Sequence, residues 1–138
     1  RDVERSRGLG DVYKRQMAVN AKQELVGGVI LPGPQLSLSA LVKNTAQLPQ
    51  IDLAAKAPAS ILGKSTSSCL QNGFVLGTAS LLDGLAERFC AELGPQTAFY
   101  ATGNLPIPIR EACCTPILYR ETLITDGLYR IWMKNKKG

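Results

Sequence analysis

The chain contains no histidine, and its four cysteines form no Cys-x-x-Cys pair. The usual zinc-finger, zincin and Ser-His-Asp arrangements are therefore excluded by ligand identity alone. The sequence also lacks an apolar run of the ~20 residues needed to cross a bilayer, and no charged start precedes an apolar signal core. We expect no membrane partner, a cytoplasmic location and cysteines that remain reduced.

Charge is also scarce through most of the chain. The net charge of +5 over 138 residues comes from the two ends: residues 1–16 carry five basic and three acidic groups, and Lys134, Lys136 and Lys137 add three positive charges. No aromatic side chains alternate with these basic groups to form a base-stacking surface. We therefore expect a globular protein of one domain with no nucleic-acid partner.

The first sixteen residues do not resemble the rest of the protein. Asp11–Gln16 back-translates to GAT GTG TAT AAG AGA CAG, the transposon mosaic end used in sequencing libraries, and Ser6–Gly10 matches the adaptor bases directly upstream in the same frame. We therefore interpret residues 1–16 as translated adaptor and exclude them from the fold. Met17 then need not be a start residue, and a segment upstream of it is expected to be missing.

The first native elements are expected to be two strands and a helix. Residues 17–19 and 24–31 read as strands around a polar turn, and Gly27-Gly28 indicates a bulge or a close backbone approach. The next helical pattern covers residues 37–48 and closes at Pro49.

A long helix is predicted over residues 67–93. Thr66 or Ser67 would be its N-cap, and Gly94-Pro95 would end it. Glycine weakens a helix interior, so its three glycines predict close approach of another backbone, either in the same chain or in a partner subunit. The helix carries one apolar stripe, made of Leu70, Phe74, Leu81, Leu85 and Phe89. Its glycines are Gly73, Gly77 and Gly84.

The remaining pattern alternates between strand and helix. A strand is expected at residues 97–101, a helical turn at 109–112 after two prolines, a strand at 117–119 and a final helix at 122–134. That last helix would turn Leu123, Leu128, Ile131 and Trp132 inward. Such alternation indicates a layered α/β domain.

Two turns are candidate ligand sites. Gly63-Lys64-Ser65-Thr66 resembles the end of a P-loop, but the place of the first glycine is taken by Pro58, which excludes the phosphate cradle. What remains is a helix start that serves either as a simple cap or as an anion or polar-ligand site. Thr102-Gly103 follows a strand, where ligands of α/β domains bind. Asp83, Glu87 and Glu92 read as a solvated helix face.

The motifs in series resemble the C-terminal half of type III pantothenate kinase across residues 17–138. They are Gly27–Gly33, Leu38-x-x-Leu41, Thr45–Pro49, Gly63–Thr66 with Gly73, Asp83-Gly84-Leu85, Ala101-Thr102-Gly103 and Thr125–Leu128.

This resemblance implies a ribonuclease-H-like α/β domain of the acetate kinase, sugar kinase, hsp70 and actin superfamily. It implies ATP-dependent phosphorylation of pantothenate to 4'-phosphopantothenate, the first step of coenzyme A biosynthesis. Mg²⁺, a monovalent cation (K⁺ or NH₄⁺) and a homodimer, which we place at the long helix, are implied as well. The alternatives are a non-catalytic accessory-factor relative involved in transcriptional activation, and a phosphotransferase of the same fold with another acceptor.

Few site residues transfer from the family. Thr66 matches the threonine that binds pantothenate, and Gly103 matches the first glycine of the nucleotide-side turn, whose second glycine is replaced here by Asn104. The family's catalytic aspartate, its cation-binding aspartate and its N-terminal phosphate motif would all precede this chain. We therefore expect no catalytic residue and no metal ligand within it, and an inactive fragment.

Overall fold

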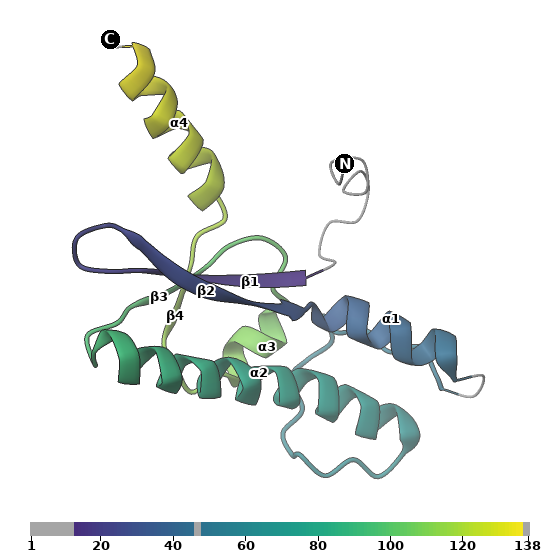
Figure 1. Cartoon of the computed structure of the whole chain (residues 1–138). Coiled ribbons are helices and arrows are strands. Elements are labelled where there is room, and N and C mark those ends of the chain that lie inside the picture. The colour runs from purple at the N-terminus through teal and green to yellow at the C-terminus, as the bar shows by residue number, and fades with distance from the viewer. Residues whose placement is uncertain (1–12, 46–47, 137–138) are drawn as a thin grey trace.

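The computed structural model describes residues 13–45 and 48–136. Within this part the chain is mixed α/β, which confirms the expected class. The strands form two separate sheets of two strands, with β1 and β2 antiparallel and β3 and β4 parallel. The elements are β1 (Tyr13–Val19), β2 (Leu25–Pro32), α1 (Pro34–Asn44), α2 (Thr66–Leu93), β3 (Phe99–Ala101), α3 (Ile107–Ala112), β4 (Ile117–Tyr119) and α4 (Leu123–Lys136) (Figure 1).

The predicted hairpin is confirmed. Its turn is organised by Asn20, whose side-chain oxygen accepts hydrogen bonds from the backbone N–H groups of Lys22 and Glu24, each at 3.0 Å. An asparagine side chain that bonds the backbone two residues on is a standard turn former. Gln23 takes a φ of 65° to complete the reversal.

Both expectations for Gly27-Gly28 are confirmed. The pairing shifts register where Ala18 faces Gly27 and Val19 faces Leu25, and Gly27 has a φ of 153°. A Cβ added to Gly28 would stand 2.2 Å from the carbonyl oxygen of Gln16, so the two backbones approach too closely for a side chain. The bulge and the contact together require glycine at both positions.

Strand β1 is longer than predicted. Residues 13–16, which we left out of the fold, pair with residues 29–32 of β2. Strand pairing uses backbone groups that every residue except proline carries, so sequence of any origin can extend a ladder. Residues 1–12 lie outside the described part of the chain.

Helix α1 begins three residues earlier than predicted and ends at Asn44. Gly33 is its N-cap and Pro34 occupies the first turn, where the missing N–H of proline costs nothing. Thr45 is already extended, and residues 46–47 lie outside the described residues.

Helix α2 matches its predicted span closely, but its buried face is different. Its buried apolar residues are Val75, Ala79 and Ala86, whereas Leu81 is 44% exposed. Leu70, Phe74, Leu85 and Phe89 are only half buried. The alanines are buried because their small side chains let a neighbouring helix approach. The prediction considered only the large apolar residues and therefore missed this face.

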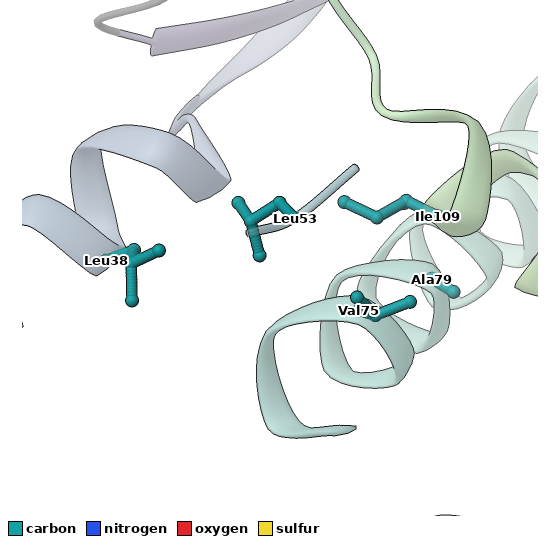
Figure 2. Packing of buried hydrophobic residues seen from close by; sticks show 5 residues of the cluster. All are labelled: Leu38, Leu53, Val75, Ala79 and Ile109. Carbon is teal, nitrogen blue, oxygen red and sulfur yellow. The ribbon is translucent and has the colours of Figure 1, made fainter. Parts of the chain in front are cut away.

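The core is small and centres on α2. Leu38 of α1, Leu53 of the following loop, Val75 and Ala79 of α2, and Ile109 of α3 form one cluster, in which Val75 and Ile109 have no exposed surface (Figure 2). Three helices and a loop are therefore joined through five side chains.

The glycines of α2 do not lie against another backbone of this chain. A Cβ built on Gly73, Gly77 or Gly84 would have no heavy atom within 4 Å, apart from the helix's own nearby backbone. Close approach within the chain, one of the two alternatives left open, is therefore wrong for the described residues.

Two bounds after α2 also differ. Strand β3 starts at Phe99 instead of Thr97, because Thr97 turns back and donates its hydroxyl to the Gly94 carbonyl at 2.6 Å. Helix α3 includes Pro108 and has Pro106 as N-cap, so these prolines start the helix instead of delaying it. The predicted strand at 117–119 is confirmed as β4.

Helix α4 is present as predicted, but its inward face is not. It extends away from the other elements (Figure 1), and it has no buried residue. Leu123, Leu128, Ile131 and Trp132 are 42–61% exposed. The periodicity of the sequence shows that the helix has an apolar face, but only the tertiary structure shows whether another element packs against that face. No helix in the described residues is long and apolar enough to cross a membrane.

Asp83 is not part of a solvated face, contrary to the prediction. Its carboxylate accepts hydrogen bonds from the backbone N–H groups of Cys114 (2.9 Å) and Thr115 (2.8 Å), and so ties α2 to the chain that leads into β4. Burial raises the pKa of Asp83, but these hydrogen bonds outweigh it and hold the pKa below its ordinary value of 3.8.

The buried cluster predicts the effect of a one-methyl truncation. Ile109→Val should lower the free energy of unfolding by about 1 kcal/mol, because Ile109 is fully buried. Urea unfolding followed by circular dichroism measures this loss. The same change at Ile124, which is 64% exposed on α4, is the control and should be neutral within about 0.5 kcal/mol. Equal effects at the two positions would contradict this core.

The Asp83 tie predicts a pH-dependent loss. Asp83→Asn should cost about 1 kcal/mol of unfolding free energy at pH 7, less than the roughly 1.5–3 kcal/mol usual for hydrogen bonds to charged groups, because the carboxylate is partly exposed to solvent. The folded pKa is depressed, so the contribution of the carboxylate is complete above the unfolded value near 4 and disappears as pH falls through the folded value. Urea unfolding at pH 7 and at about pH 2 tests this, with Glu87→Gln as control. A deficit of the same size at both pH values would disprove the tie.

Candidate functional site

The Gly63–Thr66 turn is built around Ser65 rather than Thr66 or Ser67. Ser65 is the N-cap of α2, and its hydroxyl accepts the N–H of Ser68 at 3.2 Å, while the Ser68 hydroxyl accepts the N–H of Ser65 at 2.8 Å. This reciprocal pair satisfies two backbone donors at the helix start. The predicted cap at Thr66 or Ser67 is wrong, because the helix begins at Thr66 and its cap must precede it.

Thr66 is thereby left without a role in capping the helix. Its side chain is exposed, and within the described residues its hydroxyl makes no hydrogen bond. Lys64 is exposed beside it. A threonine hydroxyl can donate one hydrogen bond and accept two, so the turn presents a polar group and a cation at the positive end of a helix.

The backbone of the turn is held close to α2. A Cβ added to Gly63 would lie 2.4 Å from the backbone nitrogen of Cys69, which only glycine tolerates. The loop before it is held by Asn72, a buried side chain whose amide donates to the carbonyls of Ser60 (2.8 Å) and Ile61 (3.3 Å). The position of Thr66 therefore depends on a glycine and a buried amide.

Asn72 was missed by the sequence analysis. A polar residue within an apolar helical segment was the available signal, since a buried side-chain amide must find hydrogen-bond partners. Asp83 was named but misassigned, because nothing local to α2 indicates its partners, which lie more than thirty residues further along the chain.

The second candidate turn, Thr102–Asn104, is held by β4 and the residues after it. Gly103 has a φ of 78°, and a Cβ added to it would meet nothing within 4 Å. Its backbone is thus open on one side and adopts a conformation that favours glycine. The Thr102 hydroxyl donates to the carbonyl of Glu121 at 3.3 Å, and the Tyr119 hydroxyl donates to the carbonyl of Gly103.

The two turns do not form one pocket in this chain. Figure 1 shows the start of α2 well apart from the end of β3. Each turn has its own anchors, on α2 and on β4. Thr66 and Gly103 are therefore separate parts of any site to which they contribute.

Cys113 is unsuited to nucleophilic chemistry, and the described residues contain no cluster of metal ligands. Burial, followed by the charge of Asp83 and the neighbouring Cys114, raises the pKa of Cys113 to about 11, so this thiol stays protonated at neutral pH. Within the described residues, no three Cys, Asp or Glu side chains are placed to hold a metal ion.

Comparison with known proteins identifies the family. A family model described as type III pantothenate kinase matches residues 16–88. A type III pantothenate kinase from Koribacter versatilis (strain Ellin345) is 40% identical over 121 residues, which cover 87% of this chain and 43% of that protein. Proteins of the same name from Frankia alni and Deinococcus radiodurans are 38% and 37% identical over 85% and 83% of the chain, covering 46% and 43% of their own lengths.

The chain thus spans less than half the length of these relatives. The model match nevertheless covers more than half of the chain itself and includes the Gly63–Thr66 turn. The resemblance read from the motifs is confirmed, and the chain belongs to the type III pantothenate kinase family.

Proposed function

We propose that the whole protein transfers the γ-phosphoryl group of ATP to pantothenate, forming 4'-phosphopantothenate in the first step of coenzyme A biosynthesis. The observation that carries this proposal is the family match, which includes the Gly63–Thr66 turn. The named relatives are more than twice as long as their matched segments, so the activity is assigned to the whole protein.

Thr66 is the proposed pantothenate contact. Capping is carried out by Ser65 and Ser68, which leaves the Thr66 hydroxyl exposed for a ligand. Pantothenate offers hydroxyl, amide and carboxylate groups, all of which can bond to a hydroxyl. Phosphoryl transfer depends mainly on positioning and charge neutralisation, so a side chain that orients the acceptor contributes directly to rate.

Gly103 is the proposed nucleotide contact. The open side of its backbone lets a ligand approach closely, which fits ATP. Asn104, in place of the family's second glycine, adds a side chain next to this approach. The requirement for Mg²⁺ and for K⁺ or NH₄⁺ belongs to the proposal. Within the described residues, no cluster of three Cys, Asp or Glu side chains could hold a metal ion.

The 138-residue chain is proposed to be an inactive C-terminal α/β domain, residues 17–138, of the ribonuclease-H-like fold. Its N-terminal domain, with the catalytic aspartate, would be missing. Residues 1–16 are proposed to be translated adaptor, a view supported by the family match, which leaves residues 1–15 outside it. The whole enzyme is proposed to act in the cytoplasm.

A homodimer through α2 is also proposed. Gly73, Gly77 and Gly84 are spaced by four and seven residues, which places them on one helix face. Open space surrounds each of them in the chain. A partner's helix packed on this face would explain three residues that each weaken the helix by about 1 kcal/mol relative to alanine.

The proposed pantothenate contact is tested in the full-length protein encoded at the same locus. Thr66→Ala should raise the KM for pantothenate about ten- to a hundredfold, the value of one or two lost hydrogen bonds, and leave the KM for ATP unchanged. Thr66→Ser should restore most of the affinity, and Ser67→Ala, which removes the next hydroxyl, is the control. An unchanged pantothenate KM in Thr66→Ala would remove Thr66 from the site.

The proposed inactivity is tested in the 138-residue chain itself. A coupled assay should detect no ADP release that depends on both ATP and pantothenate, whereas the full-length protein should be active. The upstream reading frame should encode D-x-G-N-(S/T) near its start and G-x-D-R about midway. Absence of either aspartate would favour the non-catalytic accessory factor, and activity of the short chain would disprove the fragment assignment.

The proposed dimer is tested by a bulky substitution on the glycine face. Gly77→Leu should convert a dimer to a monomer in sedimentation velocity, because the side chain fills the space needed by the partner helix. Gly127→Leu is the control, since Gly127 of α4 also has nothing within 4 Å of an added Cβ. A dimer that survives Gly77→Leu would exclude this face.

A further inference from the structure

The turn at Thr102–Asn104, which we propose as the nucleotide contact, is held by the C-terminal end of β4. The N–H of Arg120 donates to the carbonyl of Ala101 at 2.8 Å, and Thr102 donates to Glu121. Tyr119, the last residue of β4, donates its hydroxyl to Gly103. The turn after β3 is thus tied at three consecutive residues to the end of β4 and the two residues that follow.

Of these three hydrogen bonds, the one from the Tyr119 hydroxyl is made to Gly103 itself. The carbonyl of Gly103 accepts a second hydrogen bond, from the N–H of Leu105 at 3.1 Å. The carbonyl of Gly103 and the N–H of Asn104 belong to one planar, trans peptide and point in opposite directions. Whatever holds the carbonyl therefore sets the direction of that N–H. This hydrogen bond restricts the peptide most at a glycine, because the backbone of glycine is otherwise free to rotate.

The Tyr119 ring is itself braced. The guanidinium carbon of Arg110 lies 4.1 Å from the centre of the ring, within cation–π distance. The Nε atom of Arg110 is buried without a hydrogen bond among the described residues, and the guanidinium group stacks on the ring instead. Arg110 comes from α3, which begins four residues after Gly103. The turn is therefore held through Tyr119, which belongs to β4 and is contacted by α3.

The other end of β4 is fixed to α2. The carboxylate of Asp83 accepts hydrogen bonds from the N–H groups of Cys114 and Thr115, which lie three and two residues before the strand starts. Ile109, on the same short helix as Arg110, is fully buried in the core. Both β4, which carries the tyrosine, and α3, which carries Arg110, are therefore fixed to α2.

We propose that Tyr119, braced by Arg110, is a positioning residue of the nucleotide side: it sets the direction of the Gly103–Asn104 peptide against which ATP binds. This inference rests on the proposed function, because it takes the Gly103 turn as the nucleotide contact. Tyr119 acts through the turn and does not itself touch the reacting atoms.

The first test uses the 138-residue chain and hydrogen exchange followed by NMR. Tyr119→Phe removes one hydroxyl and should accelerate exchange of the Leu105 amide about five- to tenfold, the value of one hydrogen bond. The Val75 amide in the core should be unaffected. Tyr100→Phe removes the same atom from the neighbouring strand, where the side chain is 56% exposed, and should leave Leu105 unchanged. Unchanged Leu105 exchange in Tyr119→Phe would overturn the inference.

The second test uses the full-length protein and separates positioning from general support of the fold. Tyr119→Phe should raise the KM for ATP about five- to tenfold and leave the KM for pantothenate within twofold. Arg110→Met, which removes the cation above the ring, should shift the same constant in the same direction. An equal rise in both KM values would mean that Tyr119 only supports the fold and would overturn the inference. A full-length protein without kinase activity would instead refute the proposed function, and the exchange test would still decide whether Tyr119 holds the turn.

Discussion

The packing of Val75 and Ala79 against Ile109 is the contact on which the rest of this chain depends. It fixes α3 on α2, and α3 carries Arg110 to the tyrosine that holds the Gly103 turn. The same cluster includes Leu38 and Leu53, which dock α1 and the loop toward Ser60. Because a core this small has few contacts to spare, loss of this helix pair would loosen both candidate turns together.

Polar side chains of α2 then place the loops that the core does not reach. Asn72 holds the loop before the Gly63–Thr66 turn, and Asp83 holds the chain before β4. Each bonds to backbone groups, so each specifies a path of the chain without depending on the side chains found there. One long helix therefore positions both turns through two different residues, although the turns themselves lie apart.

The apolar surface left uncovered agrees with the proposal that this chain is one part of a larger protein. Several apolar side chains of α4 and of the β1–β2 hairpin are more than half exposed, among them Ile30, Ile124 and Leu128. The named relatives contain as much sequence again beyond the matched segment. Exposed apolar patches of this kind commonly mark surfaces of interaction.

Local chemistry was sufficient to predict most of the helices and strands, whereas the family came from the resemblance of the motif series. The Asn20 turn, the bulge at Gly27 and the stop at Gly94 were read correctly because each follows from the conformational range of one residue type. Tertiary structure alone decided the remainder: that Ser65 caps α2 and frees Thr66, that Asp83 is bonded rather than solvated, and that α4 lies uncovered. These depend on which groups meet across distant parts of the chain, and neither periodicity nor motif spacing contains that information.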